Sequence, residues 1–178
     1  RRNKTTCIFR GHGYGAAWSE NVVFENNQAN ACKSGFNCDT GKNRNIQLRN
    51  NLFQCCNQGI WVGNAYDNLS EFKGFQITAN SFQILEKWFN SYMEPPQYEY
   101  SYGVALGGNV TEPSIKGNEI KSVAGPKSFA DGTYGIGIGV AIESANLEIG
   151  YTLAGESNVF IGVSEEIAVR PKFYLPAG

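Results

Sequence analysis

A short motif recurs along the chain, and its regularity limits the folds that the sequence can adopt. Each copy places two apolar residues, two positions apart, before an asparagine, as in the segments 22–27 and 46–51. Separations of 24, 29 and 38 residues between the first four copies indicate a repeat of about 24 residues with insertions. The anchoring residues are Asn27, Asn51, Asn80, Asn118 and, in a weaker copy, Asn158.

Apolar and polar residues alternate on both sides of each anchor, which is typical of strands with one buried face. We predict the inward positions before the anchor at Val22 and Phe24, Ile46 and Leu48, Phe75 and Ile77, and Pro113 and Ile115. We predict those after it at Ala29 and Cys32, Phe53 and Cys56, Phe82 and Leu85, and Ile120 and Val123. A further strand begins at each Gly-apolar pair: Gly35-Phe36, Gly59-Ile60, Gly103-Val104 and Gly135-Ile136.

These short strands and Asn-Gly corners predict an all-β solenoid of about six coils with loop insertions, since no stretch has helical periodicity. Equivalent residues of neighbouring coils should lie about 4.8 Å apart. The aligned asparagines should then form a ladder that satisfies backbone groups where the chain bends. We expect 1–178 to be a single β-helix domain, with insertions at 63–73, 83–102 and 119–134. The start carries no initiator Met and no capping helix, so we expect a segment of a longer chain.

The order of strand, Asn-Asn turn, short strand and Gly-Ile strand resembles the right-handed parallel β-helix of pectate-lyase-like proteins. The resemblance covers roughly residues 6–170. It implies that the Gly-Ile strands form the sheet whose outer face lines a substrate groove. That superfamily includes polysaccharide lyases, glycoside hydrolases and epimerases, and also phage tailspikes and bacterial adhesins. The resemblance is therefore specific for the fold and leaves the function open.

Candidate catalytic residues follow from the phasing of the Gly-Ile strands. If Phe36 points inward, Asn37 and Asp39 point outward. The same phasing in the first coil places Arg10 beside Asn37 and His12 beside Asp39, although a slip of one residue would reverse these faces. We take Asp39, His12 and Arg10 as candidate catalytic residues, because polysaccharide cleavage needs an acid or a base that faces the glycosidic bond.

Candidate carbohydrate-binding residues are aromatic, because a sugar ring stacks its apolar face on an aromatic plate. We take Trp61 and Asn37 as carbohydrate-binding residues, because they should lie side by side on the outer face. The alternative is that Trp61 packs under a loop or against another subunit. The aromatic insertion at 83–102 is either a binding wall or a self-packed cap. Gly137 and Gly139 should form a bare outward floor that another chain can approach closely. From the insertion we take Trp88, Tyr92, Tyr98 and Tyr100.

Composition argues against several classes of partner. The 15 basic and 16 acidic residues give no electrostatic argument for nucleic acid, and no apolar run is long enough for membrane insertion. Cys32 and Cys56 share an inward position in adjacent coils, so a disulfide and free thiols both fit, and we expect free thiols. No Cys/His spacing indicates a metal site, and Ca²⁺ would need a carboxylate cluster that the pattern does not show. We therefore expect no cofactor and no metal.

Two functions compete. The first is a polysaccharide-binding protein, with cleavage as a lyase or glycoside hydrolase left open, whose partner is a polysaccharide or surface glycan. The second is a non-catalytic structural or adhesive module in a virion or cell-surface assembly. Both suit a homo-oligomer, with a trimer as the tailspike-like form, and an extracellular or virion-surface location.

Overall fold

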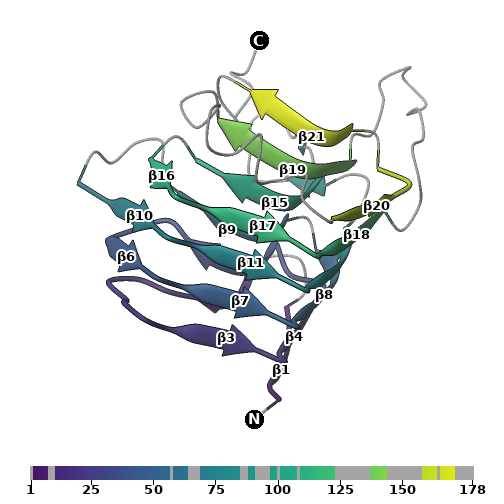
Figure 1. The fold of residues 1–178 in the computed structure, drawn as a ribbon. Helices are drawn as coiled ribbons and strands as arrows, with labels where there is room; N and C mark the ends of the chain where they lie inside the picture. The colour runs from purple at the N-terminus through teal and green to yellow at the C-terminus, as the bar shows by residue number, and fades with distance from the viewer. Residues whose placement is uncertain are drawn as a thin grey trace.

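A computed structural model describes the backbone of most of the chain. The described residues form β-strands and no helix, so this part of the chain holds no long apolar helix of the kind that spans a membrane. Figure 1 shows the strands stacked from the N-terminal end to the C-terminal end. The described ranges are 2–7, 11–56, 58–63, 69–84, 88–90, 97–99, 101–107, 109–122, 137–143, 158–163 and 165–170.

Four parallel sheets contain almost all of these strands. The glycine sheet, named for the glycine in each of its first five strands, consists of β2 (His12–Gly15), β5 (Ser34–Cys38), β9 (Gln58–Val62), β15 (Ser101–Leu106), β19 (Gly137–Glu143) and β21 (Glu165–Arg170). The short sheet consists of β6 (Lys42–Arg44), β10 (Glu71–Lys73) and β16 (Val110–Thr111). The front sheet consists of β3 (Val23–Glu25), β7 (Gln47–Arg49), β11 (Gln76–Thr78) and β17 (Ser114–Lys116). The side sheet consists of β1 (Lys4–Thr6), β4 (Gln28–Asn30), β8 (Leu52–Cys56), β12 (Ser81–Ile84), β18 (Glu119–Ser122) and β20 (Val159–Ile161).

The chain visits these sheets in a fixed order, and we call one such circuit a coil. From β5 to β8 it passes through the glycine, short, front and side sheets, and from β9 to β12 it repeats that order. Each strand pairs in parallel with its equivalents in the neighbouring coils, as β7 does with β3 and β11. This arrangement confirms an all-β fold of stacked parallel strands and is compatible with a β-helix or solenoid.

Residues of the predicted insertions contribute strands. Glu71–Lys73 of the range 63–73 form β10, and Glu119–Ser122 of the range 119–134 form β18. The range 83–102 includes an antiparallel pair, β13 (Trp88–Asn90) with β14 (Gln97–Glu99).

The core follows the predicted apolar positions through the first three coils. Phe24, Leu48, Ile77 and Ile115 are paired in register along the front sheet. In the side sheet Phe53 and Phe82 are buried and stacked, with ring centroids 5.1 Å apart. The position five residues after the anchor is predicted wrongly in the third coil: Ile84, not Leu85, pairs with Cys56. The register shift lies between β8 and β12, where β8 has one extra residue. β12 and β18 pair without a shift, so Ser122, not Val123, lies opposite Ile84.

The predicted asparagine ladder is confirmed. The four anchors from Asn27 to Asn118 each donate their backbone N–H to the side-chain oxygen of the next anchor, at 2.9–3.0 Å. The next anchor returns a bond, because its amide donates to a backbone carbonyl of the earlier coil at 2.8–2.9 Å. The amides also bond to one another along the column at 3.0–3.3 Å. Buried backbone groups at this bend are thus paired in every described coil.

The residue before each of the first four anchors turns the corner with a positive φ. Asn26, Asn50, Ala79 and Gly117 have φ of 57°, 54°, 52° and 65°, in the left-handed region that Gly and Asn adopt most readily. The need for this conformation once per coil explains part of the Asn and Gly content of the chain.

A column of glycines runs through the glycine sheet, and it corrects two predictions. A Cβ on Gly59 would lie 2.2 Å from the Phe82 ring and 2.5 Å from the carbonyl oxygen of Gly103, so only glycine fits. Gly139 belongs to the same column, since its Cβ would lie 2.4 Å from the Phe160 ring. The fourth Gly-apolar pair is therefore Gly139-Val140, with Val140 opposite Val104, and not Gly135-Ile136. Gly139 faces the core and is not part of an outward glycine floor.

Candidate functional site

A hollow of about 400 Å³ opens on the outer face of the glycine sheet, over its first two strands. Four of its nine lining residues are Gly or Ala, and the other five, from β2, β5 and the turn after β5, carry polar side chains. It is lined by His12, Gly13, Tyr14, Gly15, Ala16, Ala17, Asn37, Asp39 and Thr40.

The local sequence explains why these polar side chains are uncovered. Phe36 and Cys38 are fully buried, so the residues between and after them, Asn37 and Asp39, face outward. The backbone of Asn37 pairs with Gly15 of β2, which has no side chain to cover it. The edge strand therefore forms a low wall beside the amide and the carboxylate.

The structure brings His12, Asn37 and Asp39 together, but by a different register from the predicted one. His12 lies opposite Ser34, and Gly15 takes the place beside Asn37 that the phasing assigns to Arg10. The wrong phasing comes from the first coil, which has one neighbour only and so offers fewer constraints. Arg10 lies outside the described residues, and its role stays a prediction.

The charge state of the hollow depends mainly on His12. Partial burial lowers the pKa of His12, the charge of Asp39 raises it, and the charge of Lys33 lowers it again. The net shift is downward, so the imidazole is neutral at neutral pH. A neutral imidazole beside a carboxylate and an amide can donate and accept hydrogen bonds, and it can accept a proton.

Trp61 lies beside Asn37 in the glycine sheet, as expected, but it is not an open plate. Only 7% of its surface is exposed, and its indole N–H donates to the carbonyl oxygen of Gly63 at 3.1 Å. Burial of both faces leaves no surface on which a sugar ring can stack.

The other predicted aromatic residues cannot be placed in the same detail. Trp88 lies in β13 and Tyr98 in β14, and these two strands pair antiparallel. The side chains of both residues lie outside the described part of the structure. Tyr92 and Tyr100 lie outside the described residues altogether. The aromatic wall stays a prediction.

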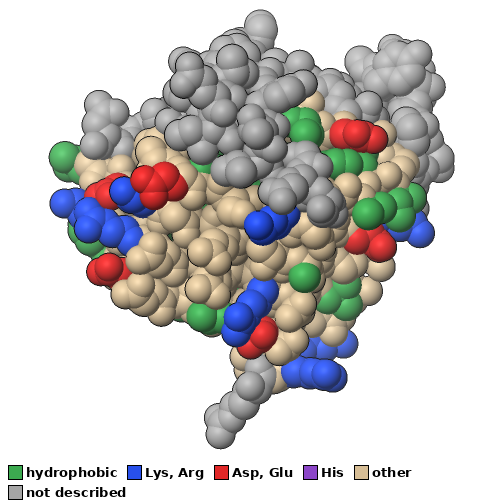
Figure 2. Space-filling model, viewed as in Figure 1, with side chains coloured by type: hydrophobic (Ala, Val, Ile, Leu, Met, Phe, Trp, Pro, Cys, Tyr) green, Lys and Arg blue, Asp and Glu red, His purple; other side chains and the backbone are tan. Residues whose placement is uncertain are grey.

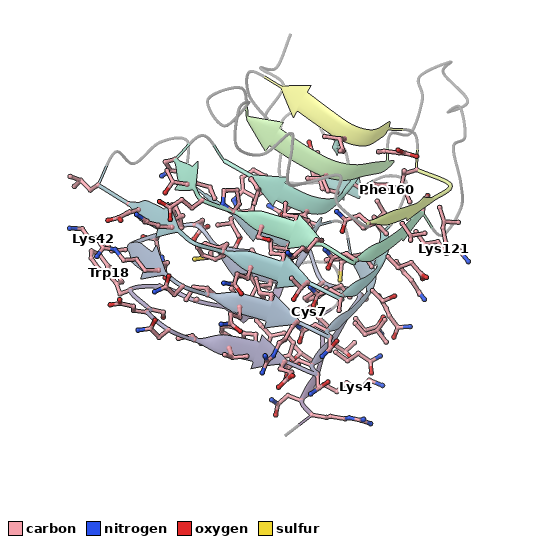
Figure 3. The ribbon with its side chains drawn as sticks, in the orientation of Figure 1. Lys4, Cys7, Trp18, Lys42, Lys121 and Phe160 are labelled. Atoms are coloured by element: carbon pink, nitrogen blue, oxygen red, sulfur yellow. The ribbon has the colours of Figure 1, made fainter. Side chains whose placement is uncertain are left out.

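Trp18, an aromatic residue that the repeat pattern does not mark, directly follows Ala17 of the lining. Its side chain is 71% exposed, and its ring lies against Gly41, the residue that precedes β6. Figure 3 shows Trp18 and Lys42 at the same edge of the molecule. The sequence holds one signal for this contact: Gly41 follows Trp18 by about one repeat, and a glycine in the next coil leaves space for the indole ring.

Cys7, Cys32, Cys38 and Cys56 are thiols that form no disulfide. Burial, together with the neighbouring thiol of Cys32, raises the pKa of Cys7 to about 11, and burial raises that of Cys38 to about 12. Protonated thiols are poor metal ligands and poor nucleophiles. Among the described residues no group of three His, Cys, Asp or Glu side chains could hold a metal ion.

Charged side chains of both signs occur among the described residues of the front and short sheets. Figure 2 shows mixed Lys/Arg and Asp/Glu side chains at one edge of the front and short sheets. They include the ion pairs of Arg44 with Glu71 at 2.8 Å and of Lys73 with Glu112 at 3.0 Å. Opposite charges alternate there, so this edge does not form a patch of one sign.

Comparison with known proteins adds no family: no family model, no curated protein and no solved structure matches this chain.

Proposed function

We propose that this chain is a right-handed parallel β-helix of about six coils, of the pectate-lyase-like kind, that binds a polysaccharide or surface glycan. Parallel strands stacked in register, and a chain that returns to the glycine sheet once per coil, support the fold. The substrate face is then the outer face of the glycine sheet, where the hollow lies.

The observation that carries the proposal is the convergence of His12, Asn37 and Asp39 on one shallow hollow. Sugar hydroxyls both donate and accept hydrogen bonds, so a site for them needs an acceptor, an amide and a group that can do either. These three side chains supply that set. The small residues Gly15, Ala16 and Ala17 of the lining leave room for a ring to reach them.

Binding is supported better than cleavage. Hydrolysis of a glycosidic bond takes two carboxyl groups on either side of it, and the described lining of the hollow holds one, Asp39. A neutral His12 could serve as a base in β-elimination, so a lyase is the cleavage reaction that these residues favour.

The test is a binding and depolymerisation screen on acidic and neutral polysaccharides. Binding is measured by retention in affinity electrophoresis, elimination by absorbance near 235 nm, and hydrolysis by new reducing ends. Asp39→Asn should weaken retention, whereas Glu119→Gln, an exposed acid of the side sheet, should not. Equal retention of both variants and the unchanged protein, or no retention on any polysaccharide, would contradict the proposal.

The alternative is a structural or adhesive module, favoured by the exposed Val159 and Ile161 on β20. Such a module forms a homo-oligomer, a trimer in the tailspike-like case, and Val159→Asp should dissociate it in sedimentation velocity. Either role suits an extracellular or virion-surface protein.

A further inference from the structure

We propose that Cys7 and Cys32 form a redox modification site, at which a low-molecular-weight disulfide such as oxidised glutathione converts the two thiols into a disulfide bond. The bond joins two neighbouring coils directly beneath a strand that lines the hollow. Three features support the site: the two thiols lie side by side, only one of them is open to solvent, and both lie against the backbone of β2. The site does not depend on the proposed function.

The strand register places the two cysteines next to each other. Cys7 directly follows Thr6, the partner of Asn30, and its backbone N–H donates to the carbonyl oxygen of Asn30 at 3.0 Å. Ala31 turns the chain with a φ of 51°, and it is the side chain of Cys32 that forms a hydrogen bond with the side chain of Cys7. Neighbouring parallel strands lie about 4.8 Å apart, within the Cα separation of about 4.4–6.8 Å that a disulfide spans.

Solvent reaches this pair from one side. Of the four cysteines whose side chains the structure describes, Cys7 is partly exposed, and the other three are fully buried. Cys56 lies one coil further along the column and forms a hydrogen bond with Cys32. A dissolved disulfide therefore meets Cys7 first, and Cys32 is the neighbouring thiol that completes the bond.

The reaction consists of two thiol–disulfide exchanges. The Cys7 thiolate attacks one sulfur of oxidised glutathione and releases one glutathione thiolate. The Cys32 thiolate then attacks the Cys7 sulfur of this mixed disulfide and releases the second. The two protein thiols are oxidised, one oxidised glutathione is reduced to two reduced molecules, and the protons lost by the cysteines are taken up by the released thiolates. Because the pKa of Cys7 is raised to about 11, the rate should rise about tenfold per pH unit between about pH 7 and 9.

Both thiols contact the strand that forms one wall of the hollow. The Cys7 thiol donates a weak hydrogen bond to the carbonyl oxygen of His12, with 3.6 Å between sulfur and oxygen. A Cβ on Gly13 would lie 3.4 Å from the Cys32 sulfur, so this sulfur lies directly under the backbone of Gly13. His12 and Gly13 both line the hollow. Oxidation removes the S–H group that donates to His12, so the change reaches the residue that sets the charge of the hollow.

The experiment incubates the whole chain with oxidised glutathione and maps its disulfides by non-reducing peptide mass spectrometry. Trypsin separates Cys7 (peptide 5–10) from Cys32 (11–33) and from Cys55 and Cys56 (50–73). We expect peptides 5–10 and 11–33 to be linked, and not in Cys7→Ser. Cys38→Ser is the matched control, because Cys38 is as buried as Cys32 but lies in β5, and it should leave the link in place.

Two further readouts test what the bond does. It closes a loop of about 25 residues, so oxidation should raise Tm by about 7–14 °C. His12 is the one histidine of the chain, and its ring signals in proton NMR should move on oxidation, but not in Cys7→Ser treated in the same way.

The peptide map of the unchanged protein decides the inference without a variant. The inference is overturned if no link forms, if Cys7 keeps a bound glutathione, or if Cys32 becomes linked to peptide 50–73. A link with unmoved His12 signals would contradict the connection to the hollow, and a link with unchanged Tm would contradict the joining of the coils. Polysaccharide retention by the reduced protein tests the proposed function separately, so the two can fail independently.

Discussion

The asparagine ladder makes a strong claim about stability, and Asn80→Ala tests it. Asn80 is buried in the middle of the column. Its side-chain oxygen accepts the backbone N–H of Asn51 at 2.9 Å, and its amide donates to the backbone carbonyl of Leu48 at 2.8 Å. Alanine removes both partners, so the backbone N–H of Asn51 is left unpaired in the protein interior and the Leu48 carbonyl loses its bond to the amide.

The cost can be worked from those two groups. Leaving the buried N–H unsatisfied costs about 1–3 kcal/mol and losing the second hydrogen bond costs about 1 kcal/mol, so the change should lower the free energy of unfolding by about 2–4 kcal/mol. A domain has about 5–15 kcal/mol in total, so Asn80→Ala should remove a large share of it. At about 2–4 °C per kcal/mol, a loss of about 3 kcal/mol corresponds to about 6–12 °C in Tm.

Asn27→Ala is the matched control, because it makes the same change at the first rung of the same column. The side-chain oxygen of Asn27 accepts from the side chain of Asn3, and its amide donates to the side chain of Asn51, so no backbone group depends on it. It should cost about 1 kcal/mol, the net worth of an ordinary hydrogen bond. Urea unfolding followed by far-UV circular dichroism measures both variants. A loss in Asn80→Ala no larger than in Asn27→Ala would refute the reasoning.

Three further predictions concern the column of glycines, the hollow and the thiols. Gly59→Ala should destabilise the fold by several kcal/mol in urea unfolding, because its Cβ would lie 2.2 Å from a core ring, whereas Gly11→Ala, with its nearest neighbour at 3.6 Å, should cost little. The protein has one histidine, so proton NMR should show His12 titrating below 6.5, and lower still in Asp39→Asn, since that carboxylate raises its pKa; a rise would contradict the assignment. Because the pKa of His12 is lower in the folded protein than in the unfolded chain, the unfolded chain binds the proton more readily. His12 should therefore lower the free energy of unfolding as the pH falls below 6.5 and have no such effect above it. Cys38, with a pKa raised to about 12 by burial, should resist maleimide at pH 8 until urea unfolds the chain, and rapid labelling of the folded protein would show the site to be open.

The repeat could be predicted from the sequence because the backbone needs the same hydrogen-bonding residue at the same bend of every coil. Each coil needs an asparagine to pair the groups at its bend, and Asn51, Asn80 and Asn118 meet that need at positions the apolar pattern also marks. Burial on one face of each strand then fixes the register, since a slip of one residue would expose the core. Local pattern and long-range pairing agree there.

Where an extra residue enters a strand, the pattern no longer reports the register. Ile84 takes the place expected of Leu85 because β8 has one residue more than β12 over the same span, and alternation alone does not show which strand carries it. Gly139 was separated from its column because Gly135, Gly137 and Gly139 alternate with apolar residues in the same way.

The candidate site was read in part. Its polar residues lie on the predicted face, so His12, Asn37 and Asp39 were found even though the register of the first coil was wrong. The tryptophans were not distinguished, because exposure is decided by what packs over a residue, which alternation does not record. Trp61 is covered, whereas Trp18 lies open on a turn.

The direction of the asparagine bonds has a consequence for synthesis on the ribosome. In each rung, the later asparagine supplies both the acceptor and the donor that the earlier coil lacks, as Asn118 does for the N–H of Asn80 and the carbonyl of Ile77. A coil that has just left the exit tunnel therefore keeps two unpaired backbone groups until the following coil arrives. Loss of coils from the C-terminal end would uncover these two groups, whereas loss from the N-terminal end would uncover the asparagine amide and the N–H of the residue after it, as at Leu52, which donates to the carbonyl oxygen of Asn27. During synthesis, the hydrogen bonds of each coil at this bend are therefore completed only when the next coil has been made.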